Sequence, residues 1–175
     1  MLHVLTTLLR KLEGLRYQRG IERALALHSR GDIRKDGLHA TNLATQLRIE
    51  WRARDIHPWD RGLVSPPQRA AAFVEQSLAD TEAAICRLFD ALPQVDVIAL
   101  RVLDRTSETV IISGTVSRLA VSARDQNLST GMRLLYLGLT YHSAGSLFEP
   151  LEDRRSGSAT GAGELLTARH ESIAG

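Results

Sequence analysis

The chain has 175 residues, enough for one ordinary domain, and its content of 43% hydrophobic and 24% charged residues is typical of a soluble globular protein. No apolar run approaches the roughly 18 residues of a membrane span, which argues against a transmembrane protein. The net charge is only +2, and the single cysteine, Cys86, excludes an internal disulfide and a cysteine-based zinc cluster. The N-terminus lacks the features of a signal peptide, so we expect a cytoplasmic protein.

Residues 1–30 are predicted to form an N-terminal amphipathic helix. Large apolar side chains recur there at intervals of three and four residues, and most basic side chains fall on the other side. The apolar stripe contains Leu2, Leu5, Leu8, Leu9, Leu12 and Leu15. Because this stripe is wider than one small domain readily covers, we expect self-association through residues 2–15. The alternatives are that the helix packs on its own domain or lies on a membrane surface.

A polar link at 30–41 leads to a predicted strand at 46–55. Apolar residues alternate there with charged ones, so that one face is apolar and the other is a ladder of arginines. A helix through 43–55 is the alternative, since many of these residues are good helix formers. The arginine ladder and two tryptophans could bind a charged ligand or nucleic acid. The candidate residues are Arg48, Trp51, Arg52, Arg54, Trp59 and Arg61.

The densest cluster of functional side-chain types comes directly after this strand. Asp55, His57 and Asp60 could supply an acid–base pair or metal ligands. Their spacing matches no specific motif, and Pro58 turns the chain between them. A zinc site needs three or four convergent ligands held by outer hydrogen bonds, and no other cluster completes the set. We therefore predict that these three residues are structural and that the protein holds no catalytic metal and no cofactor.

A long amphipathic helix is predicted from Pro66 onward. Ser65 and Gln68 have the spacing of a capping box, and Pro66 suits the first helical position. Pro93 ends the helix because the residue before a proline is pushed out of the α region. One face carries the apolar stripe of Ala70, Phe73, Val74, Leu78, Ala84, Ile85, Leu88, Phe89 and Leu92. A flat apolar surface must cover this face.

Three strands are predicted after the helix. Residues 95–103 are apolar on both alternating faces, as in a central strand, and 109–118 alternate between apolar and polar side chains. The short polar link between them predicts an antiparallel hairpin. Residues 132–141, with leucines at every second position, are predicted to be the third strand. Gly114 and Gly138 interrupt these patterns, which is typical of a bulge or a close backbone approach.

These elements predict an α+β fold in which a mostly antiparallel four-stranded sheet packs on one long helix. The domain spans 31–150 in the order β, α, β, β, β, after the amphipathic helix at 1–30 and before a flexible C-terminal tail at 151–175. The leading hypothesis is a non-catalytic binding or assembly module of an intracellular complex. The alternatives are a nucleic-acid-binding protein that uses the arginine-rich strand, and an enzyme that uses Asp55, His57 and Asp60.

Overall fold

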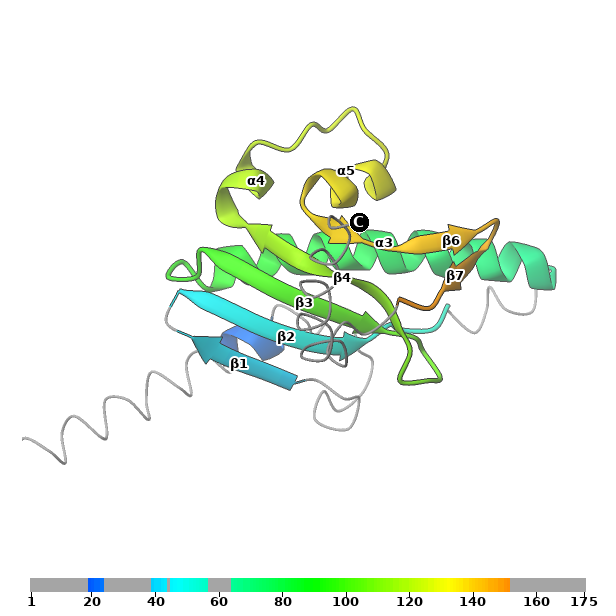
Figure 1. Ribbon diagram of the computed structural model, residues 1–175, viewed down its shortest axis with the longest axis horizontal. Coiled ribbons are helices and arrows are strands. Elements are labelled where there is room, and N and C mark those ends of the chain that lie inside the picture. The colour runs from blue at the N-terminus through cyan, green and yellow to red at the C-terminus, as the bar shows by residue number, and fades with distance from the viewer. Residues whose placement is uncertain (1–18, 24–38, 44, 57–63, 152–175) are drawn as a thin grey trace, which may run out of the picture.

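The computed structural model describes residues 19–23, 39–43, 45–56 and 64–151 (Figure 1). The long helix α3 (Pro66–Ala91) lies across one face of a mixed sheet, and the short helices α4 (Arg118–Ser122) and α5 (Thr130–Tyr136) lie beyond β4. The predicted α+β fold with one long helix on a sheet is therefore confirmed. No helix in the described part of the chain is long and apolar enough to cross a membrane.

The main sheet has the strand order β1-β2-β3-β4-β5, and β6 and β7 form a separate hairpin. The strands are β1 (His39–Leu43), β2 (Gln46–Arg52), β3 (Val97–Leu103), β4 (Val110–Ser117), β5 (Leu139–Thr140), β6 (His142–Ala144) and β7 (Leu147–Glu149). The neighbours β2 and β3 are parallel, whereas the other pairs are antiparallel. A parallel pair needs a long crossover connection, and α3 supplies it.

The core lies between α3 and the sheet. The helix buries Phe73, Ser77, Leu78, Thr81, Ala84, Ile85, Leu88 and Phe89. They meet buried sheet side chains that include Leu47, Ile49, Trp51, Ile98, Leu100, Val102, Ile112 and Val116. Each large apolar side chain buried in this way contributes about 1.5–3 kcal/mol. The helix begins as predicted, because the Ser65 backbone N–H donates to Gln68 Oε1 at 3.0 Å.

Two further predictions about the sheet are confirmed. Residues 46–52 form a strand, not a helix, and β3 and β4 pair as an antiparallel hairpin. The glycines mark a close backbone approach, because a Cβ on Gly114 would lie 2.4 Å from the carbonyl oxygen of Gly138. Only glycine at 114 allows β5 to approach β4 in this way.

The strand predicted at 132–141 is wrong. Residues Thr130–Tyr136 form α5, and only Leu139–Thr140 are a strand. The alternating leucines were misleading, because Leu134 and Leu137, three residues apart, are both buried while Leu135 is 43% exposed. Gly138, at a φ of 94°, ends this helical segment and donates its N–H to the Leu135 carbonyl.

The polar link predicted at 30–41 is also partly wrong, because His39–Leu43 form β1, which pairs with β2. A short polar strand of this kind lacks the apolar alternation by which strands are recognised in a sequence.

Within the predicted N-terminal helix, residues 19–23 are helical, and Ile21 is buried. Gly20 lies against the end of α3, since a Cβ there would be 3.1 Å from Leu92 Cδ2. The leucine stripe at 2–15 and the tail from 152 onward lie outside the described residues.

Candidate functional site

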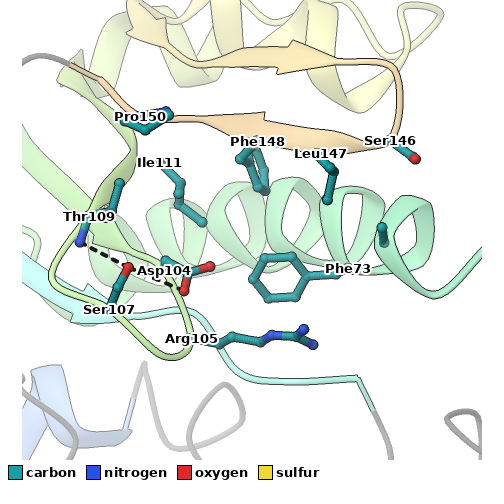
Figure 2. A pocket seen from close by; sticks show the side chains of 11 residues that line it. Phe73, Asp104, Arg105, Ser107, Thr109, Ile111, Ser146, Leu147, Phe148 and Pro150 are labelled. Atoms are coloured by element: carbon teal, nitrogen blue, oxygen red, sulfur yellow. Dashed lines mark hydrogen bonds between the residues drawn. The ribbon is translucent and has the colours of Figure 1, made fainter. Parts of the chain in front are cut away.

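A pocket of about 280 Å³ lies between the N-terminal half of α3, the β3–β4 loop and the β6–β7 hairpin (Figure 2). It is lined by Ala70, Phe73, Asp104, Arg105, Ser107, Thr109, Ile111, Ser146, Leu147, Phe148 and Pro150. These residues come from three separate segments of the chain, so the folded core positions the pocket. Its walls combine apolar side chains with hydroxyls, one carboxylate and one guanidinium.

Aromatic rings form one part of the wall. Phe148 of β7 meets the Phe73 ring of α3 edge to face, with centroids 6.1 Å apart and an interplanar angle of 88°. Tyr141 meets Phe148 on another side in the same manner, at 6.3 Å and 86°. Such pairs are favourable beyond their buried area. They attach the β6–β7 hairpin to α3 and so hold the pocket between them.

The β3–β4 loop is held by the carboxylate of Asp104. Its Oδ2 accepts hydrogen bonds from the Thr106 N–H and hydroxyl, both at 2.9 Å, and from the Ser107 hydroxyl at 3.4 Å. Burial by itself raises the pKa of Asp104, but the hydrogen bonds from Thr106, Arg105 and Ser107 outweigh it, and the pKa lies below its ordinary value. The carboxylate is therefore charged at neutral pH.

Arg52 holds the same loop from the sheet. Its Nη1 donates to the carbonyl oxygens of Asp104 at 2.9 Å and Ser107 at 2.5 Å, and its Nη2 pairs with the Glu108 carboxylate. The loop is thus fixed both from within and from β2.

Arg105 projects from this loop over the Phe73 ring. Its Cζ lies 5.0 Å from the ring centroid, and its Nη1 donates to Asp55 Oδ1 at 2.6 Å. The same Asp55 oxygen accepts the N–H of Ile56 at 2.9 Å. The structure therefore places Asp55 in an ion pair beside the pocket. The other residues of the predicted cluster, His57, Trp59, Asp60 and Arg61, lie outside the described residues.

The arginines of the predicted ladder, two on β2 and Arg54 just after it, are directed to different parts of the protein. Arg48 is exposed, Arg52 holds the β3–β4 loop, and Arg54 forms an ion pair with Asp80 of α3, in which Nη2 lies 3.0 Å from Oδ1. Trp51 is only 7% exposed and belongs to the core. These candidate residues do not converge on one surface.

A second group of charged side chains lies where α5 packs on α3. The guanidinium of Arg133 donates to both carboxylate oxygens of Glu82, at 2.7 and 2.6 Å. Nearby Cys86 is partly buried, and burial raises the pKa of its thiol, an effect that the charge of Arg124 partly opposes. This arrangement connects two helices and disfavours a reactive thiolate.

One face of α5 exposes large apolar side chains. Met132, Leu135 and Tyr136 are 44%, 43% and 73% exposed, and their spacing places them on one side of the helix. Leu119 on α4 is 81% exposed as well.

Among the described residues, no group of three or more His, Cys, Asp or Glu side chains could hold a metal ion. Comparison of the chain with known protein families, with curated proteins and with solved structures finds no match.

The pocket was not predicted from the sequence, because residues 104–108 have the composition of a plain polar link. Asp104 followed by Thr106 and Ser107 is a signal for a turn closed by side-chain hydrogen bonds, and it could have indicated an ordered loop. Nothing in the sequence indicates that Phe148 meets Phe73, because they are far apart along the chain.

Proposed function

We propose that this protein is a non-catalytic binding module and that the pocket between α3, the β3–β4 loop and the β6–β7 hairpin is its ligand site. The observation that carries this proposal is the combination in one cavity of an aromatic wall with several polar groups. The single cysteine, which fits a reducing compartment, supports an intracellular location for the module.

The charged groups of the pocket favour binding over catalysis. Asp104 is engaged by its own loop, and Arg105 is paired with Asp55. An acid–base pair requires two titratable groups that converge on one reacting atom, and these two are each directed to a different partner.

The proposal is tested by recording amide chemical shifts of the full chain against a fragment library that contains cations, anions and neutral molecules. We expect some fragments to shift the amides of Arg105, Ser107 and Phe148. Ala70→Phe places a large side chain in the pocket and should abolish this binding. Ala79→Phe makes the same change at an exposed position of α3 away from the pocket and should leave it unchanged. A library in which no fragment shifts these amides would refute the proposal.

A second candidate function is assembly with a second copy of the chain. It is supported by the apolar face of α5, where Met132, Leu135 and Tyr136 are exposed. These three side chains carry no charge, so the same face on another copy can meet it without electrostatic repulsion. Self-association through residues 2–15 is a separate prediction for the same function.

The nucleic-acid alternative has less support. A base would need an accessible aromatic ring for stacking, and Trp51 is buried. Arg52 and Arg54 are both engaged with carboxylates of the protein itself.

The enzyme alternative depends on Asp55, His57 and Asp60. It is tested by elemental analysis of protein purified without chelator, together with the His57→Ala variant. One bound metal per chain that is lost in this variant, with the fold retained, would favour the enzyme over the binding module.

A further inference from the structure

The polar groups of the pocket differ in how many hydrogen bonds they already form within the protein. The Ser107 hydroxyl donates to Asp104 and accepts the N–H of Thr109 at 3.3 Å. The hydrogen bonds that Asp104 accepts from the Thr106 N–H and hydroxyl and from the Ser107 hydroxyl all end on Oδ2. In Figure 2 the other oxygen of Asp104 is turned toward the space between Ile111 and Phe73. An acceptor with negative charge therefore lies at one end of the pocket.

The positive charge in the wall is already neutralised. Arg105 is paired with Asp55 at 2.6 Å and stacks on Phe73. In Figure 2 its guanidinium lies on the side of the Phe73 ring that is away from Phe148. An anionic ligand in the pocket would thus meet the charge of Asp104 without an unpaired cation to balance it.

The rest of the lining sets the size and polarity of a ligand. Phe73, Ile111, Leu147, Phe148 and Pro150 offer apolar contact. The volume of about 280 Å³ lies near the lower end of the range for ligand pockets, so the pocket suits a small ligand. A compact apolar body with one polar end fits these walls.

We infer that the pocket binds a small organic cation, in which an ammonium group donates to Asp104 and an apolar or aromatic body packs against Phe73, Ile111 and Phe148. This inference rests on the proposed function, since it names the ligand class of the same pocket. A free amine and a lysine side chain of a partner protein share this chemistry, and the experiment separates the two sources.

The test compares three ligands of nearly equal size on the full chain at neutral pH, by titration calorimetry and amide shifts: 2-phenylethylamine, 2-phenylethanol and phenylacetate. A charge-assisted hydrogen bond predicts that the amine binds at least about tenfold more tightly than the alcohol, and phenylacetate least tightly. Nα-acetyl-lysine methylamide is the fourth ligand. Tighter binding of this compound than of 2-phenylethylamine would identify the lysine side chain as the source of the cation.

Two variants assign the effect to Asp104. Asp104→Asn keeps an acceptor for the loop but removes the charge, and we expect it to weaken amine binding about tenfold while alcohol binding changes less than about twofold. Glu149→Gln removes an exposed carboxylate of β7 that does not line the pocket, and it should leave amine binding unchanged. If Asp104→Asn does not fold, the comparison of the three ligands on the natural chain decides the question alone.

The outcomes separate the inference from the proposed function. Equal or tighter binding of the alcohol or of phenylacetate in the pocket would overturn the cation inference and leave the binding module intact. If none of the four ligands shifts the pocket amides, the inference fails, and the broader fragment library decides whether the pocket is a ligand site at all.

Discussion

The guanidinium of Arg118 contacts both the backbone carbonyl and the ring of Phe89. Its Nη1 donates to the Phe89 carbonyl oxygen at 3.0 Å, and its Cζ lies 4.8 Å from the centroid of the Phe89 ring. The same guanidinium donates to the carbonyl oxygens of Leu92 at 2.8 Å and Val95 at 2.7 Å. The last carbonyls of a helix have no partner within the helix, so Arg118 caps the C-terminal end of α3 and joins it to the start of α4.

Arg118→Met should lower the free energy of unfolding by about 1.5–3 kcal/mol, because it leaves several partly buried carbonyl oxygens without a donor. Arg118→Lys should cost less, since an ammonium group can reach some of these oxygens but lacks the planar guanidinium fork. Urea unfolding measures both. Arg48→Met, the same change at an exposed position of β2, is the control and should have little effect. Equal midpoints for the variants at 118 and 48 would contradict this role of Arg118.

Leu88→Ala should lower the free energy of unfolding by about 2–5 kcal/mol, because Leu88 is fully buried between α3 and the sheet and its loss leaves a cavity. Glu75→Ala, at an exposed position of the same helix, should cost little. Similar urea midpoints for the two variants would mean that the buried face of α3 is wrongly assigned.

Leu88→Ala and Glu75→Ala test α3, the part of the fold that the sequence predicts most directly. A long helix has a start signal at Ser65, a stop signal at Pro93 and an apolar stripe between them, and all three act over short distances. The error at 132–141 shows the limit of this reasoning. A ten-residue run with leucines at 135, 137 and 139 satisfies the period of a strand, although Ser129 begins a helix there by accepting the N–H of Met132.

The pocket could not be predicted from the sequence in the same way. Its features depend on contacts between distant segments, such as Arg105 with Asp55 and Phe73 with Phe148. The sequence did identify Asp55 as a residue of interest, but its partner is defined only by the parallel pairing of β2 with β3, which places the ends of these two strands together.

Cys86 should react slowly with iodoacetamide in the native protein at pH 8. Burial raises the pKa of its thiol, so the reactive thiolate is scarce. We expect a rate at least about tenfold lower than in the urea-unfolded chain, measured by mass spectrometry. Arg124→Gln should slow the reaction further, because the charge of Arg124 lowers the pKa of this thiol. Native and unfolded chains that react equally fast would show that the thiol is not protected.

The full chain should sediment as a dimer. If the apolar face of α5 forms the contact, the double variant Leu135→Ser and Tyr136→Ser should be monomeric, because both side chains would otherwise be buried between the copies. Leu119→Ser, at an exposed apolar position of α4, is the control and should remain a dimer.

A chain that starts near Asp32 separates this contact from the predicted leucine stripe at 2–15. If the truncated chain is a monomer and the α5 double variant is a dimer, the N-terminal segment forms the contact between the copies. A monomeric full chain would contradict both interfaces.

Asp104 should stabilise the protein in a pH-dependent manner. Its pKa in the folded state lies below the ordinary 3.8, because the hydrogen bonds from Thr106, Arg105 and Ser107 outweigh the effect of burial. A lowered pKa means that the stabilisation is fully present above the unfolded value and disappears as the pH falls through the folded value. At pH 7, Asp104→Asn should therefore cost about 1 kcal/mol, a magnitude reduced by the solvent exposure of the loop.

Urea midpoints of the natural chain and of Asp104→Asn, measured from pH 7 to about pH 2.5, test this prediction. The difference between them should stay constant down to about pH 5 and close below pH 4, as the natural carboxyl becomes protonated and resembles the neutral amide. Other carboxylates titrate in both proteins and cancel in the difference. Glu108→Gln should show a smaller difference at pH 7, because its exposed pair with Arg52 contributes little. A difference between the natural chain and Asp104→Asn that persists to pH 2.5 would mean that the charge of Asp104 does not stabilise the β3–β4 loop.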